Sequence, residues 1–489
     1  MSEKNALPDV DFGARQRMTS IEAFHLHSSS EQWPNCIISR NRFTGSLDIA
    51  DAKRAWLHCI GRHKYSSWKV DSRGWPAWDV NADQQRLGDV AEATFHDVVV
   101  DRLGENELEL DLPGLNERGI PQVVAASEEG FGLWCVRSET DENVILIFAV
   151  DHALTDGVAG MGFVRQWMTA YHNLRTNADI DRGLTKLDWQ RWKSRSKLGL
   201  LKWSFLKFLP CQAIGLFGAT KFIFRKFSTI EPKKQPHTDD MAYPGIVGQT
   251  LSNRTVGTLS DRADRLGVST NSLLMTILFR ALKRIQSLIE SEDHNRCTWQ
   301  ERNWIRLVVP IGIRSIADRK LPLTNKTSLV QIERTFDQVA NADGAAQSLD
   351  REVRIIMGFK LDIVFLIAIR LASIIPGFLR WVAANQKSRG TAVFTNLGEP
   401  FRKTRACNFR DVGELKLVDY DVCGPLRSGT PLNFAWSTFR QFDGEESKLH
   451  GRVSLHYDRK VMAEELAQSI LDAFVKELED VVQFGGSGG

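Results

Sequence analysis

The sequence lacks any hydrophobic run long enough to cross a membrane. Its two most apolar stretches, Phe208–Thr220 and Leu371–Leu379, meet charged residues well short of the roughly 20 apolar residues that a membrane-spanning helix needs. The first ten residues contain early acids and no apolar core of the signal-peptide type. We therefore expect a cytoplasmic chain with neither a transmembrane helix nor an export signal.

Paired cysteines are also missing. The seven cysteines are odd in number, scattered along the chain, and form no C-x-x-C motif. This usage is typical of a reduced chain rather than of a disulfide framework or a zinc site. No Gly-rich phosphate loop appears, and His25 and His27, on a polar N-terminal segment, are too isolated to hold a metal. The sequence therefore predicts no metal and no bound cofactor.

A strong net charge is absent as well, because 63 Lys and Arg oppose 60 Asp and Glu to give +3. A balance this small does not favour nucleic acid as the main partner. The 43% hydrophobic and 25% charged residues are typical of a folded globular protein. Since 489 residues are too many for one compact core, we expect two lobes of roughly 200 residues each.

The N-terminal lobe is predicted to span residues 1–186. Apolar residues at helical spacing predict a helix at 48–63, directly after a strand at 42–47. Two apolar runs within 131–150, separated by a polar stretch, predict a β-hairpin. The apolar face that follows predicts a buried helix at 158–175.

A connector at 187–248 ends in a polar, Pro-containing linker at 228–240 and separates this lobe from a C-terminal lobe at 249–489. No internal sequence repeat is visible. In the C-terminal lobe we expect a helix beginning after Ser269 or Thr270, which would cap it. The other expected elements are strands at 305–310, 392–395, 432–439 and 449–457, a long apolar helical region at 355–384, and a final helix at 463–482.

The turn between the predicted hairpin and the buried helix concentrates reactive side chains. It contains His152, Asp156 and Gly157 in the pattern H-x-x-x-D-G. A histidine held between a strand and a helix can take up a proton near neutral pH. Asp156 can cap the helix or pair with an arginine, and Gly157 allows backbone geometry that other residues resist. The alternative interpretation is a core histidine beside a helix-capping aspartate.

With this motif the sequence resembles the superfamily of chloramphenicol acetyltransferase, condensation domains, wax ester synthases and plant acyltransferases. The resemblance extends over most of the chain. The further segments that resemble the family are Arg42–Asp48, Gly61–His63, Val309–Arg314 followed by Asn325, Thr395–Gly398 and His456–Asp458.

The resemblance implies an α/β (α+β) fold in which two lobes, each a mixed sheet with flanking helices, form a pseudo-dimer around a tunnel. A monomer is compatible with this architecture. His152 would be the general base that activates a hydroxyl or amine acceptor toward an acyl thioester, donated by acyl-CoA or an acyl carrier protein. Asp156 would be structural and paired with Arg314, Gly157 would give room for the start of the helix, and Asn396 would support the oxyanion or the tunnel wall.

One departure weakens part of this resemblance. Condensation domains and wax ester synthases usually carry a second histidine before the motif, where this chain has Asp151. No carrier domain is visible before the Gly-rich end at 485–489, whose match to G-x-S-x-G lacks a strand-turn-helix context. Two alternatives stay open: an amide-forming enzyme of the condensation type, and a non-catalytic module that binds a carrier protein or a lipid.

A basic aromatic stretch at 191–227 carries nine Lys or Arg and no acidic residue. It is compatible with an amphipathic segment at a membrane interface or with a packed connector whose cations are solvated. Contact with lipid would indicate a lipidic acceptor or acyl chain, as in wax ester synthases. For 361–379 we favour a buried helix interrupted by Pro376-Gly377.

Overall fold

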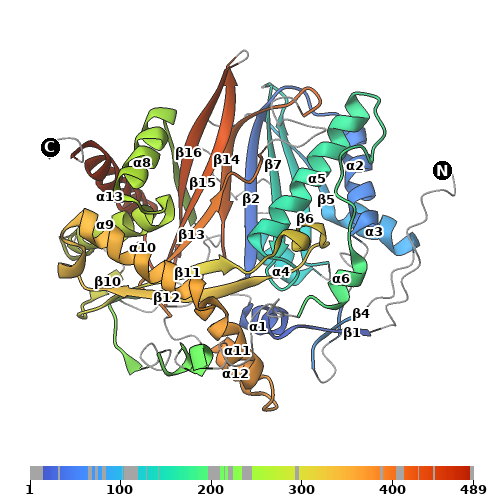
Figure 1. The fold of residues 1–489 in the computed structure, drawn as a ribbon. Coiled ribbons are helices and arrows are strands. Elements are labelled where there is room, and N and C mark those ends of the chain that lie inside the picture. The colour runs from blue at the N-terminus through green and yellow to red at the C-terminus, as the bar shows by residue number, and fades with distance from the viewer. Residues whose placement is uncertain are drawn as a thin grey trace.

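The protein is represented by a computed structural model. It describes residues 15–30, 33–63, 69–71, 75–79, 84–101, 103, 119–127, 129–140, 142–196, 210–213, 215–218, 224–233, 245–291, 297–385, 389–402, 412–427, 429–443 and 446–484. Two large sheets stand side by side in the middle of the molecule, and most helices cover their outer sides (Figure 1).

The first large sheet has the strand order β14-β2-β7-β6-β5. Its strands are β2 (Cys36–Thr44), β5 (Phe95–Val100), β6 (Phe131–Ser138), β7 (Asn143–Asp151) and β14 (Lys416–Cys423). The hairpin predicted within 131–150 is therefore confirmed as β6 and β7, which pair antiparallel. Strand β14 comes from the C-terminal half of the chain and pairs with β2, so the two halves are joined by a shared sheet.

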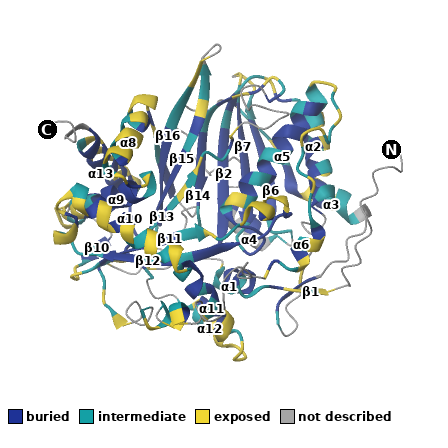
Figure 2. Ribbon diagram, viewed as in Figure 1, coloured by how far each residue is buried: buried dark blue, intermediate teal, exposed yellow. Residues whose placement is uncertain are grey.

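Successive side chains of strand β7 point alternately into two apolar clusters, as expected when both faces of a sheet are buried. One face carries Leu146 and Phe148 and packs against helices α2 (Ile49–Arg62), α3 (Gln84–Thr94) and α5 (Gly157–Arg175). The other face carries Ile145 and Ile147 and packs against α4 (Gly119–Ala126). Figure 2 shows these strands as a buried centre beneath partly exposed helices. The predicted helices at 48–63 and 158–175 correspond to α2 and α5.

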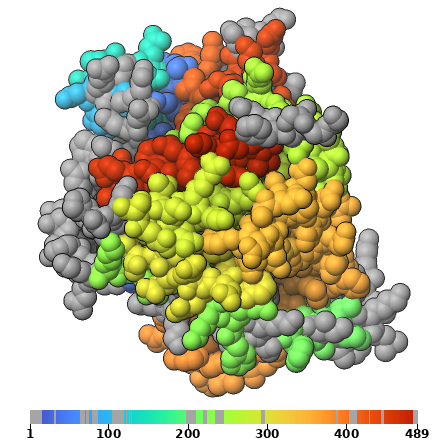
Figure 3. Space-filling model, turned by 90° about the vertical axis from the view of Figure 1, so that its left-hand side faces the viewer, coloured from blue at the N-terminus to red at the C-terminus, as the bar shows by residue number. Residues whose placement is uncertain are grey.

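The second large sheet has the order β12-β11-β13-β15-β16-β9. Its strands are β9 (Gly245–Leu251), β11 (Ile305–Gly312), β12 (Thr327–Arg334), β13 (Ala392–Gly398), β15 (Leu432–Asp443) and β16 (Glu446–Tyr457). Helices α8 (Asn253–Leu266), α9 (Thr270–Ser291), α10 (Ala342–Gly358) and α13 (Glu464–Phe484) accompany it. Helices α9, α10 and α13 lie together on the outer face shown in Figure 3. Ser269 caps α9, since its hydroxyl accepts from the Ser272 N–H at 3.1 Å.

The remaining elements are short. Strands β1 (Arg15–Arg17), β4 (Ala77–Asp79) and β3 (Lys69–Asp71) form one small sheet, and β10 (Cys297–Gln300) and β8 (Thr229–Pro232) form another. The short helices are α1 (Ser20–Ser28), α6 (Trp189–Lys193), α11 (Val364–Ala372) and α12 (Phe378–Ala384), with 3-10 turns η4 (Ile316–Lys320), η5 (Asp337–Val339) and η6 (Leu361–Ile363). The expectation of two lobes, each with a mixed sheet and flanking helices, is confirmed.

Two local expectations are wrong. The linker predicted at 228–240 begins as strand β8, because its residues pair with β10. The long helical region at 355–384 is broken twice: the chain leaves α10 through Lys360, which has φ 56°, and turns again at Gly377, which has φ 75°. Its apolar residues are therefore shared among three separate helices.

Three arginines of the basic aromatic stretch pair with acids of the two lobes. The guanidinium of Arg195 pairs with Glu22 at 2.7 Å, and both side chains are buried. Arg191 and Arg225 pair with Asp318 and Glu333, each at 2.7 Å. These ion pairs agree with a packed connector, whereas Phe217 and Phe224 of the same stretch are 74% and 81% exposed, so both interpretations stay open. Residues 197–209, 214 and 219–223 lie outside the described residues. Among the described helices, none has the length and apolar character to span a membrane.

Candidate active site

His152 follows the last residue of β7 and is held by backbone contacts on both sides. Its N–H donates to the Asn35 carbonyl, 2.7 Å away, just before β2. The carboxylate of Asp151 accepts from the Ala153 N–H at 2.7 Å and fixes the turn that follows. The imidazole therefore lies at the end of a central strand and is held by its neighbours rather than carried on a free loop.

The hydrogen bonds of the ring determine which nitrogen is the base. His152 Nδ1 lies 2.9 Å from the Thr155 carbonyl oxygen, which can only accept. This contact assigns the proton to Nδ1 and the lone pair to Nε2, and the Asn325 amide, whose nitrogen also lies near Nδ1, then donates to the His152 carbonyl at 2.7 Å rather than to the ring. This is the tautomer that a general base requires, with the free nitrogen turned away from the turn that holds the ring.

Asn325 brings the second lobe onto the same histidine. It lies in the connection between β11 and β12, and its amide donates to the His152 carbonyl at 2.7 Å. The amide nitrogen also lies 3.0 Å from His152 Nδ1. Its oxygen accepts from the Thr327 N–H at 3.2 Å, which fixes the orientation of the amide. His152 therefore lies at the interface of the two lobes.

The environment favours a neutral imidazole. Burial lowers the pKa of His152 below its ordinary value, and the positive charge of Arg427 lowers this pKa further. The carboxylate of Asp156 and the hydrogen bond to Thr155 act in the opposite direction. A neutral ring at neutral pH is ready to accept a proton, and the nearby carboxylate stabilises the imidazolium that results.

Asp156 connects the lobes through an ion pair. One carboxylate oxygen lies 2.8 Å from Arg314 Nη2 and also accepts from the Lys326 N–H at 2.7 Å. The other oxygen caps α5 by accepting from the Ala159 N–H at 2.9 Å. The pairing with Arg314 that the sequence suggested is thus present, and the exposed fractions of the side chains, 3% for Asp156 and 12% for Arg314, show that water is largely excluded.

Gly157 gives room at the start of α5, one of the two roles expected for it, rather than an unusual backbone geometry. Its φ does not lie in the left-handed region, so its backbone geometry is open to other residues. A Cβ at this position would instead lie 3.2 Å from Leu397 Cδ2, on strand β13 of the other lobe. The missing side chain therefore allows the start of α5 to approach the second lobe closely.

His25 is a site residue that the sequence analysis did not identify. It lies on α1, and its ring stacks on that of His152 with centroids 3.9 Å apart and an interplanar angle of 13°. The Asn35 amide donates to His25 Nδ1 at 2.9 Å and to the His25 carbonyl at 3.0 Å. Burial lowers the pKa of His25 well below its ordinary value, and the charges of His152 and Arg427 lower it further.

Asn396 is not brought to His152. Its amide donates to the Asn271 side chain at 3.2 Å, its oxygen accepts from the Gly398 N–H at 2.8 Å, and the residue is exposed. These contacts shape the end of β13. They give no support to a role at the oxyanion, which stays a prediction.

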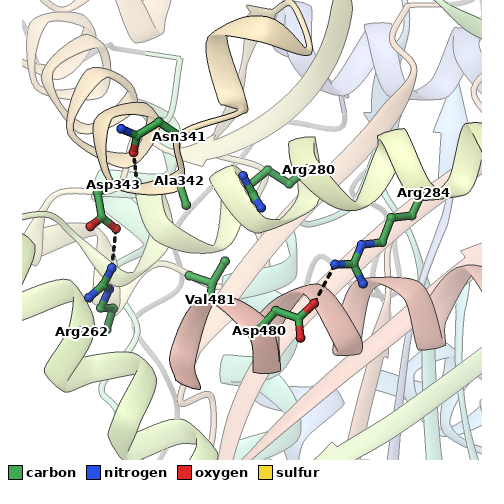
Figure 4. Close-up of a pocket in the computed structure, with 8 residues that line it drawn as sticks. All are labelled: Arg262, Arg280, Arg284, Asn341, Ala342, Asp343, Asp480 and Val481. Carbon is green, nitrogen blue, oxygen red and sulfur yellow. Dashed lines mark hydrogen bonds and ion pairs between the residues drawn. The ribbon is translucent and has the colours of Figure 1, made fainter. Parts of the chain in front are cut away.

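A surface pocket of about 390 Å³ lies apart from this site, between α8, α9, α10 and α13 (Figure 4). Its three arginines each have a carboxylate partner: Arg262 pairs with Asp343, Arg280 with Glu477, and Arg284 with Asp480. The charges that line this pocket are therefore paired within the second lobe. Over the described part of the chain, no cluster of His, Cys, Asp or Glu has the makings of a metal site.

No protein-family model matches the sequence, and no curated protein matches it significantly. Solved structures match it over nearly its whole length. Trichothecene 15-O-acetyltransferase from Fusarium sporotrichioides matches with a TM-score of 0.66 at 14% identity, covering 96% of this chain and 94% of that one. The first condensation domain of the calcium-dependent antibiotic synthetase gives 0.65 at 14%, covering 96% and 97%. The X-domain from teicoplanin biosynthesis gives 0.61 at 14%, covering 97% and 96%. The chain therefore has the fold that an acetyltransferase and nonribosomal-peptide condensation domains share.

Proposed function

We propose that the protein is an acyltransferase that moves an acyl group from a thioester to a hydroxyl or amine acceptor, with His152 as general base. The supporting observation is the imidazole itself. Its Nδ1–H is held by the Thr155 carbonyl, its Nε2 is left unprotonated, and burial lowers its pKa. A ring held in this tautomer and kept neutral is suited to take up a proton from an acceptor.

The proposed reaction uses one proton twice. His152 Nε2 takes the proton of the acceptor as the acceptor oxygen or nitrogen bonds to the thioester carbonyl carbon. The tetrahedral intermediate then collapses, the carbon–sulfur bond breaks, and the imidazolium returns the proton to the leaving thiolate. The carboxylate of Asp156 stabilises the imidazolium between these two steps. No residue of this chain becomes acylated.

The proposal includes acyl-CoA and acyl carrier protein as donors, and lipidic acceptors of the wax ester or diacylglycerol type among the alcohols. Amide formation on carrier-bound substrates is the second candidate, because condensation domains match the fold as well as the acetyltransferase does. Asp151, in place of the second histidine usual in condensation domains, favours the first candidate.

The test is thiol release from acyl-CoAs of short, medium and long chain, with pooled alcohols and amines as acceptors. We expect acceptor-dependent release that falls by roughly 10²- to 10⁴-fold in His152→Ala, the usual contribution of a general base. His27→Ala is the matched control, since His27 lies on α1 at the surface side and should leave the rate unchanged. Release that is equal in His152→Ala and the wild type would exclude His152 as the base. No release with any CoA or carrier-protein donor would favour a binding module.

A further inference from the structure

We infer that the helical hairpin α11–α12 is a membrane-docking surface that binds anionic phospholipid. The hairpin projects from the lower edge of the molecule in Figure 1. Two observations carry this inference: a cluster of exposed apolar side chains at its tip, and a surface charge of one sign along its arms. It does not depend on the chemistry proposed for His152.

The hairpin is amphipathic across its two faces. The inner side chains of both helices are buried in the core of the first lobe, with exposed fractions of 3% for both Ile369 and Leu379. The outer side chains are large, apolar and exposed: Leu371 52%, Ile374 72%, Ile375 57%, Phe378 39% and Trp381 64%. Scattered single apolar residues are normal at a surface, but a contiguous group of this kind marks an interaction site.

The tip is held in a fixed shape. Ile374 N–H donates to the Leu371 carbonyl at 3.1 Å, and Phe378 N–H donates to the Ile375 carbonyl at 3.1 Å. The rings of Phe378 and Trp381 stack with centroids 5.6 Å apart. The apolar side chains are therefore presented together on a convex, ordered turn, and no folding of the hairpin is needed before it docks.

The charge of the hairpin indicates which kind of partner binds it. From residue 363 to residue 398 the sequence contains no Asp or Glu. Arg370 and Arg380, one on each arm beside the tip, are exposed. A convex apolar tip with tryptophan, flanked only by cations, fits the headgroup and upper acyl region of an anionic membrane. A folded protein partner would have to offer a deep groove lined with acids.

The hairpin also lies next to the candidate active site. Helix α1 packs against both α11 and α12, and Phe24 of α1 meets Phe365 of α11 edge to face at 5.3 Å. The same helix carries His25 against His152. One helix therefore separates the proposed membrane surface from the reacting imidazole.

Flotation of the full-length protein with phosphatidylcholine vesicles, with and without phosphatidylserine, tests the inference. We expect binding that requires phosphatidylserine and falls with salt. Ile374→Ser/Ile375→Ser should lower the partition coefficient at least roughly tenfold, and Arg370→Gln/Arg380→Gln should lower it roughly fivefold per cation. All four positions are exposed, so the melting temperature should stay at the wild-type value.

The matched control is Ile316→Ser, which removes an isoleucine that is 81% exposed and lies on η4, outside the hairpin. Binding unchanged in the Ile374→Ser/Ile375→Ser variant, or equal losses in this variant and the control, would overturn the inference. Absence of binding to both kinds of vesicle would overturn it too. So would a concentration-dependent dimer in light scattering that disappears with Ile374→Ser/Ile375→Ser, because a second copy of the chain would then cover the tip.

Discussion

The imidazole of His25 lies flat on the imidazole of His152, with ring centroids 3.9 Å apart. The Asn35 amide donates to His25 Nδ1, and the Asn35 carbonyl accepts from the His152 N–H, so one residue holds both histidines. Because His25 stays neutral through burial, it supplies a fixed aromatic wall rather than a second base. We expect it to be a positioning residue for His152.

His25→Ala should therefore lower kcat by roughly tenfold to a hundredfold, since a free ring face allows His152 to leave its productive orientation. His25→Phe should restore most of the rate, because a phenyl ring keeps the stacking surface. His27→Ala provides the control on the same helix. If His25→Phe is as slow as His25→Ala while both melt at the wild-type temperature, stacking is not the contribution of His25.

The pH dependence of the reaction follows from the neutral base. Because burial lowers the pKa of His152, kcat/KM should rise with pH to a plateau and have its midpoint below the ordinary histidine value of 6.5. Arg427 contributes to this lowering through its charge. Arg427→Gln should therefore move the midpoint to higher pH, in a profile measured with saturating acceptor. A midpoint that moves down would contradict this assignment.

The residues themselves predicted the part of the site that is local in the chain, and the family resemblance added Arg314, 158 residues from Asp156. His152, Asp156 and Gly157 were recognisable because strand, turn and helix follow one another within a short segment. His25 and Asn325 were not assigned roles, because their contacts with His152 cross long separations, 173 residues in the case of Asn325. A lone histidine on a short polar segment carries no signal of the ring that it will meet.

The same limit applies to the fold. Helices α2, α5, α9 and α13 and the β6–β7 hairpin were predicted from the spacing of their apolar residues. The pairing of β14 with β2 was not, because it depends on which edge lies free in three dimensions. The helix expected at 355–384 was wrong because its apolar residues are nearly continuous. The interruption at Pro376-Gly377 was expected, but continuity does not reveal the turn at Lys360. Nor does it reveal that one side of the hairpin stays exposed, where a buried helix was favoured for 361–379.

The ion pair between Asp156 and Arg314 predicts a coupling between the lobes. Asp156→Asn should destabilise the protein by roughly 3 kcal/mol, because the variant leaves a buried guanidinium without its counter-charge. Arg314→Gln should cost a similar amount, and the double variant should cost clearly less than the sum. Chemical denaturation of the four proteins measures this cycle. Additive losses would mean that the two side chains stabilise the fold independently.

Gly157→Ala tests the close approach of the lobes. The added Cβ would lie 3.2 Å from Leu397 Cδ2, so a small shift of a flexible side chain can accommodate it. We expect a loss of stability of about 1 kcal/mol, and a larger loss of roughly 2–3 kcal/mol in Gly157→Val. Gly162→Ala in the same helix is the control, because a Cβ there meets no atom within 4 Å. Equal effects at the two glycines would show that Leu397 does not limit position 157.

Asp151 predicts an unusual pH dependence of stability. Burial raises the pKa of its carboxyl to about 6, although the hydrogen bond from the Ala153 N–H lowers it. The folded state therefore holds the proton more tightly than the unfolded state, and this contribution to stability is lost as the pH rises from about 4 to about 6.

Asp151→Asn stays neutral and keeps an oxygen for the Ala153 N–H. We expect this variant to gain roughly 2–3 kcal/mol over the wild type at pH 7.5 and almost nothing at pH 4, measured by denaturant titration. A variant less stable than the wild type at pH 7.5 would mean that the ionised carboxylate has a partner which outweighs its burial.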